Sequence, residues 1–93
     1  MSLSVRSDRA VIVFDRLSRA VTQNGRQVAT LGSINSVRVD EEATDAGPIG
    51  WRVTLHLAGS RAVMIGRTRD GSAASAVAAG IATIAGTRVV KRT

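Results

Sequence analysis

Apolar and polar residues alternate without interruption between positions 51 and 57. The apolar positions are Trp51, Val53, Leu55 and Leu57, and the polar positions between them are Arg52, Thr54 and His56. Successive side chains of a β-strand point to opposite faces of its sheet. The pattern therefore predicts a strand with one buried face and one solvated face.

Five further segments have the length and the β-branched content of strands. They comprise residues 10–15, 19–23, 27–31, 34–40 and 61–65. Turn signals separate them at residues 15–18, 24–25, 32–33 and 59–60. Asn24-Gly25 predicts a type I′ hairpin, because both residues tolerate a positive φ. Residues 41–50 hold three acids, two glycines and the only proline, and they predict the one long loop of the chain.

Helical spacing begins at Asp70. Asp70 or Ser72 is the expected N-cap, and Gly86 is the expected residue that ends the helix. The expected buried face comprises Ala73, Ala76, Val77, Gly80, Ile81, Ile84 and Ala85. Gly80 costs a helix interior about 1 kcal/mol relative to alanine. We interpret it as a point where the helix backbone approaches the sheet closely.

Together these elements predict an α+β fold. An antiparallel meander of about six strands forms a bent sheet or partial barrel, closed by one C-terminal helix. A chain of 93 residues has room for a single domain, which we place at residues 4–90. Residues 1–3 resemble an expression leader and are left out of the fold prediction. Residues 91–93 are expected to fray.

Composition supports a folded soluble domain. Apolar residues make up 44% of the chain and charged residues 22%, and there is no cysteine to form a disulfide or a zinc–thiolate site. The formal net charge is +6, and 12 of the 13 basic residues are arginine. Arginine binds phosphate and carboxylate in a bidentate manner. The preference for arginine over lysine also fits a GC-rich bacterial genome. Both interpretations, anion binding and genome composition, stay open.

No apolar run approaches the about 20 residues that span a bilayer. The first residues also lack the charged, apolar and small-residue blocks of a secretory signal. We therefore expect a cytoplasmic protein.

The string FDRLSRAV is followed by an Asn-Gly turn, LGSINSVRV, WRVTLHL, RAVMIGR and an alanine-rich helix. This order resembles bacterial pleckstrin-homology-like (PH-like) domains of unknown function. The matching positions are Asp15, Arg16, Ile34 and Val37, with residues 61–67 ahead of the helix, and the resemblance covers roughly residues 8–90. It implies a meander closed by a helix. A full barrel of this kind has seven strands, and residues 3–6 are the candidate for the missing one.

The sequence offers no recognisable catalytic set and predicts no cofactor. His56, the only histidine, has no Ser or Asp motif beside it, so we interpret it as a solvated strand residue rather than a general base. Glu41, Glu42 and Asp45 lack the spacing of a calcium loop, and we interpret them as solubilising residues. The chain is predicted not to be an enzyme and to hold no metal.

Two sets of arginines are candidates for binding an anionic surface. The first set suits a nucleic-acid backbone: Arg38 and Arg52, with His56 as a further candidate, are expected on one open sheet face, and Arg61, Arg67 and Arg69 at its edge. Phe14 and Trp51, the only aromatic residues, fall at predicted core positions, so base stacking is not expected. The second set comprises Arg16, Arg19 and Arg26. The resemblance implies acidic lipid headgroups for this set, because PH-like domains that bind lipid use basic residues on their first loops.

Protein–protein interaction is the function that we favour. An open meander leaves edge strands that can pair with another chain. No charged residue lies between Gly71 and Gly86, so Ser75, Ala79 and Thr83 on the outer helix face are candidate contacts with a partner protein or a second copy. The alternative, that these small residues face solvent, stays open. We expect a noncatalytic assembly or regulatory module, with binding to an anionic surface as the second hypothesis.

Overall fold

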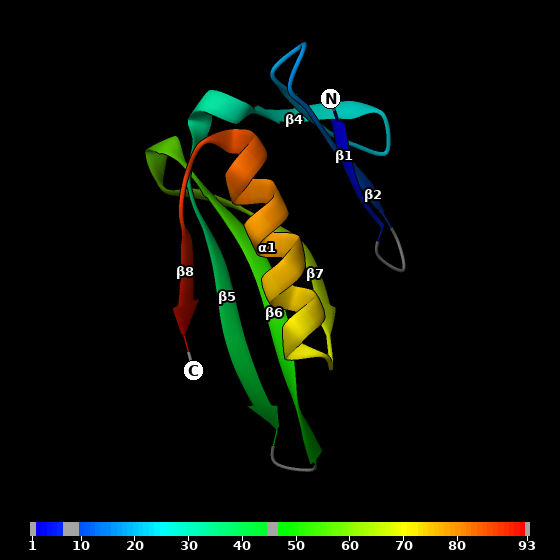
Figure 1. The fold of residues 1–93 in the computed structure, drawn as a ribbon, viewed down its shortest axis with the longest axis vertical. Helices are drawn as coiled ribbons and strands as arrows, with labels where there is room; N and C mark the ends of the chain where they lie inside the picture. The colour runs from blue at the N-terminus through cyan, green and yellow to red at the C-terminus, as the bar shows by residue number, and fades with distance from the viewer. Residues whose placement is uncertain (1, 7–9, 45–46, 93) are drawn as a thin grey trace.

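The computed structural model describes residues 2–6, 10–44 and 47–92 (Figure 1). The order of elements is β1 (Ser2–Arg6), β2 (Val11–Asp15), β3 (Ala20–Gln23), β4 (Arg26–Thr30), η1 (Leu31–Ser33), β5 (Ile34–Thr44), β6 (Gly47–Leu57), η2 (Ala58–Ser60), β7 (Arg61–Thr68), α1 (Gly71–Ala85) and β8 (Val89–Arg92). The strands form two four-stranded sheets, and α1 packs against both of them.

The first sheet has the order β1-β2-β3-β4, and all of its neighbouring strands are antiparallel. Asn24 and Gly25 have φ values of 52° and 83°, which confirms the predicted hairpin. The turn before β3 is also confirmed. Asp15 closes that turn, because its Oδ1 accepts a hydrogen bond from the Leu17 N–H and its Oδ2 accepts one from the Ser18 hydroxyl, both at 3.0 Å.

The second sheet has the order β7-β6-β5-β8. Strand β6 is antiparallel to β5 and β7, whereas β8 runs parallel to β5 (Figure 1). Two contacts hold the start of β8 in place. The Thr87 hydroxyl donates to the carbonyl of Asn35 at 2.6 Å, and the Val37 N–H donates to the carbonyl of Arg88 at 3.0 Å.

The α+β class and the C-terminal helix are confirmed, but the prediction of about six antiparallel strands in one meander is wrong. The residues that the structure describes form eight strands in two sheets, and one of their strand pairs is parallel. Ser2 and Leu3 do not stand outside the fold, since both belong to β1 and Leu3 pairs with Phe14. Lys91 does not fray, because it pairs with Val39 in β8. Met1 and Thr93 lie outside the described residues.

The long loop predicted at residues 41–50 is the tip of the β5–β6 hairpin. In this hairpin Glu41 pairs with Trp51 and Glu42 pairs with Gly50. Residues 45 and 46 lie outside the part of the chain that the structure describes. Acidic residues are compatible with strand structure here, because Glu42 forms ion pairs with arginines on the neighbouring strands. The two arms extend past the helix and define the long axis of the molecule, 42 Å.

Both predicted caps of the helix are confirmed. The Asp70 Oδ1 accepts hydrogen bonds from the backbone N–H of Ser72 at 2.9 Å and of Ala73 at 3.3 Å, and Gly86 ends the helix with φ 70°. The face of α1 that is buried in the structure is rotated about the helix axis relative to the predicted one. The buried residues are Ala74, Ala78, Ile81 and Ala82, whereas Ala73 and Ala76 are exposed. Within the described residues, no helix has both the length and the apolarity needed to cross a membrane.

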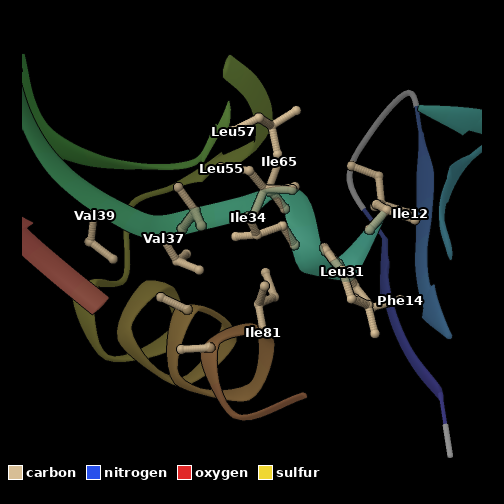
Figure 2. Close-up of a cluster of buried hydrophobic side chains, with 14 of the residues drawn as sticks. Ile12, Phe14, Leu31, Ile34, Val37, Val39, Leu55, Leu57, Ile65 and Ile81 are labelled. Carbon is tan, nitrogen blue, oxygen red and sulfur yellow. The ribbon is translucent and has the colours of Figure 1, made fainter. Parts of the chain in front are cut away.

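A single core joins the two sheets through the helix. Figure 2 shows Ile81 of α1 facing Ile34 and Val37 of the second sheet, with Leu31 on the side of Phe14 in the first sheet. Small alanines line the centre of the helix face, so the helix backbone lies close to β5 and β6. The larger Val77 and Ile84 are only partly buried, at the margins of this face.

Candidate functional site

The outer face of the second sheet carries Arg38, Arg52 and His56, which the sequence placed together. Because β5 and β6 pair in register, Arg38 lies opposite Thr54 and Asp40 lies opposite Arg52. The Arg38 Nη2 is 3.2 Å from Asp40 Oδ1, and its Nη1 is 3.4 Å from His56 Nε2. A guanidinium rather than a carboxylate therefore neighbours the histidine.

Acidic residues neutralise much of the charge on this face. The Arg52 Nη1 is 3.1 Å from Glu42 Oε1, and the Arg67 Nε is 3.6 Å from Glu42 Oε2. The Nε atoms of Arg38 and Arg52 are buried without a hydrogen-bond partner in the structure. An anion that approaches this face must compete with Asp40 and Glu42 for the guanidinium groups.

The other predicted anion-binding arginines are distributed over separate surfaces. Arg16 and Arg19 lie at the turn before β3, whereas Arg26 lies in the hairpin at the opposite end of the same sheet. The Arg61 Nη2 donates to the carbonyl of Val28 at 3.2 Å, and Arg69 is exposed next to the helix cap. The structure thus does not bring the eight arginines into one patch. Anion binding by any of them stays a prediction.

Of the three acidic residues considered for a cation, the structure describes Glu41 and Glu42. Glu42 faces Arg52 and Arg67, and Asp45 lies outside the described residues. Among the residues that the structure describes, no three His, Asp or Glu side chains gather closely enough to hold a metal ion. The structure gives no geometry on which a metal site can be built.

An open groove of about 730 Å³ lies between the end of the first sheet, strand β7 and the first half of α1. It lies where two strands of the first sheet end beside β7. Strands β1 and β3 end at Arg6 and Gln23, while β7 continues to Thr68 along the second sheet. We call this feature the β7 groove. Its apolar lining comprises Val5, Ala10, Val53, Met64, Ile65, Ala73, Ala74 and Val77.

A β-bulge shapes the wall of the β7 groove. Val53 pairs with Gly66 and Thr54 pairs with Met64, so Ile65 is an extra residue in β7. The Ile65 side chain is buried at 3% exposure, whereas Met64 is 51% exposed. Bulges commonly re-aim side chains at functional positions. Here Met64 pairs with Thr54 of the outer sheet face, and it lines both the edge of the β7 groove and the hollow beside His56 on that outer face.

Two arginines, Arg6 and Arg67, border the β7 groove. Arg6 lies on the face of β1 that points away from the helix, and Arg67 contacts Glu42, so part of its charge is compensated. Gln23, Thr68 and Gly66 complete the described lining, which contains no carboxylate. The described lining therefore combines an apolar wall with two arginines at its border.

The predicted helix interface is only partly accessible. Ala79 and Thr83 are exposed, but Ser75 is half-buried. The Thr83 hydroxyl donates to the Ala79 carbonyl at 2.8 Å, as threonine often does inside a helix. A protein contact on this face stays a prediction.

Sequence reasoning missed the β7 groove. Met64 belongs to a segment recognised as a strand, and its exposure depends on the bulge at Ile65 and on where the first sheet ends. The only local signal is the glycine that follows Ile65, since glycine inside a strand often marks a bulge.

No protein-family model matches the chain. A search of the curated proteins found no match, and neither did a search of the solved structures.

Proposed function

We propose that this chain is a noncatalytic, PH-like protein-interaction module whose β7 groove binds an apolar segment of a partner protein that carries a carboxylate. The observation that carries the proposal is the open groove of about 730 Å³ with its mostly apolar lining, at whose β7 edge Met64 is 51% exposed. The succession of a four-stranded meander, a three-stranded meander and a C-terminal helix supports the PH-like assignment.

Size and lining favour a peptide segment. Binding sites commonly have volumes of about 300–1,000 Å³ and are mostly apolar, with a few polar groups that orient the ligand. The β7 groove has this composition, but it is open along β7 rather than enclosed. An open groove can accommodate several neighbouring side chains of one partner segment. Methionine suits such a surface because its flexible thioether adapts to different partners.

The charge of the groove selects among apolar segments. Arg6 and Arg67 are its only charged members in the described lining, and the whole chain has a formal net charge of +6. A partner segment with Asp or Glu beside its apolar residues gains a charge-assisted contact. A basic segment is repelled. Attraction at the rim mainly raises the association rate, whereas the apolar contacts set the lifetime of the complex.

Selection from a phage-displayed library of random peptides tests the proposal. We expect the enriched sequences to share apolar residues flanked by Asp or Glu. A labelled copy of the most enriched peptide is then titrated with the protein and followed by fluorescence anisotropy. Met64→Gln should weaken this peptide about tenfold, which corresponds to a loss of about 1.4 kcal/mol.

Matched variants separate the groove from general surface effects. Leu17→Gln makes the same apolar-to-polar change at a side chain that is 90% exposed in a distant turn, and it should leave affinity unchanged. Arg6→Gln should weaken binding in low salt, whereas Arg16→Gln, which removes the same charge elsewhere, should not. The proposal fails if no peptide is enriched, or if the enriched peptides bind the Met64→Gln and Arg6→Gln variants as well as they bind the unmodified protein.

A further inference from the structure

The four sheet edges of this molecule differ in how well they are protected against pairing with another chain. Strand β4 has an extra residue at Val28 and β7 has one at Ile65, and bulges of this kind interrupt the ladder that an added strand would need. The Arg61 side chain also donates a hydrogen bond to the carbonyl of Val28 in β4. The remaining edges are β8, which is four residues long and carries Lys91, and β1.

Strand β1 has no bulge, and its charged residue, Arg6, lies at its last position. All five of its residues pair with β2 without a register shift, and its sequence, SLSVR, contains neither proline nor glycine. The side chains of β1 alternate regularly between the two faces of the sheet. Leu3 and Val5 are half-buried on the helix side, and Ser2, Ser4 and Arg6 are exposed on the opposite side.

The hydrogen bonds of β2 show which backbone groups of β1 point outward. The Val11 carbonyl accepts from the Asn24 N–H, and the Val11 N–H donates to Asn24 Oδ1, both at 2.9 Å, so the backbone groups of Val11 point toward β3. Backbone groups alternate between the two neighbours of a strand. Those of Ile12 and Phe14 therefore point toward Val5 and Leu3 of β1. It follows that the N–H and carbonyl groups of Ser2, Ser4 and Arg6 point toward the unpaired edge.

We propose that β1 pairs antiparallel with β1 of a second copy, about a two-fold axis at Ser4, to give one continuous eight-stranded sheet. In this register Ser4 faces Ser4 of the other copy, Ser2 faces Arg6, and Leu3 faces Val5. The outward backbone groups of Ser2, Ser4 and Arg6 then bond across the axis. Leu3 and Val5 of both copies form an apolar row on the helix side of the joined sheet.

Charge placement is compatible with this register. No two like charges lie opposite each other, because Arg6 of each copy faces Ser2 of the other. Both copies use the same surface, as a two-fold interface requires. The net charge of +6 on each copy opposes association at long range. Salt screens that repulsion. Dimerisation is therefore weak in low salt and becomes stronger as salt is added, the reverse of binding to a polyanion.

Sedimentation equilibrium of the full chain at several salt concentrations tests the proposal. We expect a monomer–dimer equilibrium in the micromolar range that shifts toward dimer with rising salt. Ser4→Pro removes an outward N–H that makes no bond in the monomer, so the fold tolerates it and the dimer is lost. Ser4→Lys places two like charges on the axis and should also give a monomer. Gln27→Lys, the same charge on the exposed edge strand β4, should leave the equilibrium unchanged.

Amide hydrogen exchange locates the contact independently. The Ser4 amide should become protected as the concentration of the unmodified protein rises, and it should stay unprotected in the Ser4→Lys variant. A protein that remains monomeric at all salt concentrations overturns the proposal. So does a dimer that survives both Ser4 variants while circular dichroism shows them folded.

Discussion

Gly71 at the start of α1 lies directly against the indole of Trp51. A Cβ at position 71 would stand 2.8 Å from both Cε2 and Nε1 of the Trp51 ring, closer than a Cβ atom approaches other heavy atoms in proteins. The Lys91 ammonium lies 5.1 Å from the centroid of the same ring, so Trp51 links the helix start to strand β8. Trp51 thus fixes where the helix begins over the second sheet.

Gly71→Ala should lower the free energy of unfolding by about 1–3 kcal/mol, the usual cost of overpacking against a rigid group. Urea denaturation followed by far-UV circular dichroism measures the change. The penalty should largely disappear when Gly71→Ala is introduced into a Trp51→Leu background, because the shorter side chain leaves room for the methyl group. Equal penalties in both backgrounds would show that the contact is not the cause.

Gly80→Ala should have the opposite effect. A Cβ at position 80 would lie 3.5 Å from Leu3 Cδ2, which is ordinary van der Waals contact, so the interpretation of Gly80 as a close-approach site is wrong. Alanine gains helix propensity and fills space beside β1. We expect the free energy of unfolding to rise by about 0.5–1 kcal/mol. A loss of stability in the same urea experiment would mean that α1 and β1 lie closer together than the structure shows.

Asp70→Ala removes the acceptor for two backbone N–H groups at the helix start. The expected cost is about 1 kcal/mol in the free energy of unfolding. Asp70→Ser is the matched control, since its hydroxyl can still accept such a bond and should retain most of the stability. If the alanine and serine variants unfold at the same urea concentration, the cap contributes nothing.

The contribution of the turn before β3 to the stability of the fold should depend on pH. The hydroxyl of Ser18, followed by the N–H of Leu17, donates to the Asp15 carboxylate and lowers its pKa below the ordinary value of 3.8. Because the folded pKa lies below the unfolded one, the stabilising contribution is complete above the ordinary pKa. It is lost as the pH falls through the lowered folded value.

Ser18→Ala should therefore raise the pKa of Asp15 toward its ordinary value. An NMR titration of the Asp15 carboxyl carbon in both proteins measures this directly. An unchanged midpoint in the variant would show that the hydroxyl contact does not hold the carboxylate.

Elements whose signals lie within a few residues could be predicted from the sequence. The Asn24-Gly25 turn, the alternation at residues 51–57, and the Asp70 and Gly86 caps all depend on local chemistry, and each is confirmed. Strand β1 is indicated only by the family resemblance, which makes residues 3–6 the candidate for an additional strand, and β8 is not predicted. Both strands are short, and β8 forms by pairing with a segment distant in the chain, as Val89 does with Val37.

The candidate site depends even more on tertiary structure. The acids at residues 41–42 predict a loop on composition alone, and only the β5–β6 register shows that Glu42 pairs with Arg52. The β7 groove is lined by residues from both sheets and from the helix, and no local sequence pattern records that arrangement. Its visible consequence in the sequence is limited to Met64 and the glycine two residues later.

The central claim, that the β7 groove binds an apolar and acidic segment, is tested most directly by NMR. The ¹⁵N-labelled protein is titrated with the peptide enriched by phage display, and chemical-shift changes are mapped on the structure. We predict changes at residues 64–68, at Val5 and Arg6 beside them, and at residues 73–77 across the groove. Changes concentrated on the outer sheet face around Arg38 and His56, or on the helix face at Ala79 and Thr83, would contradict the account.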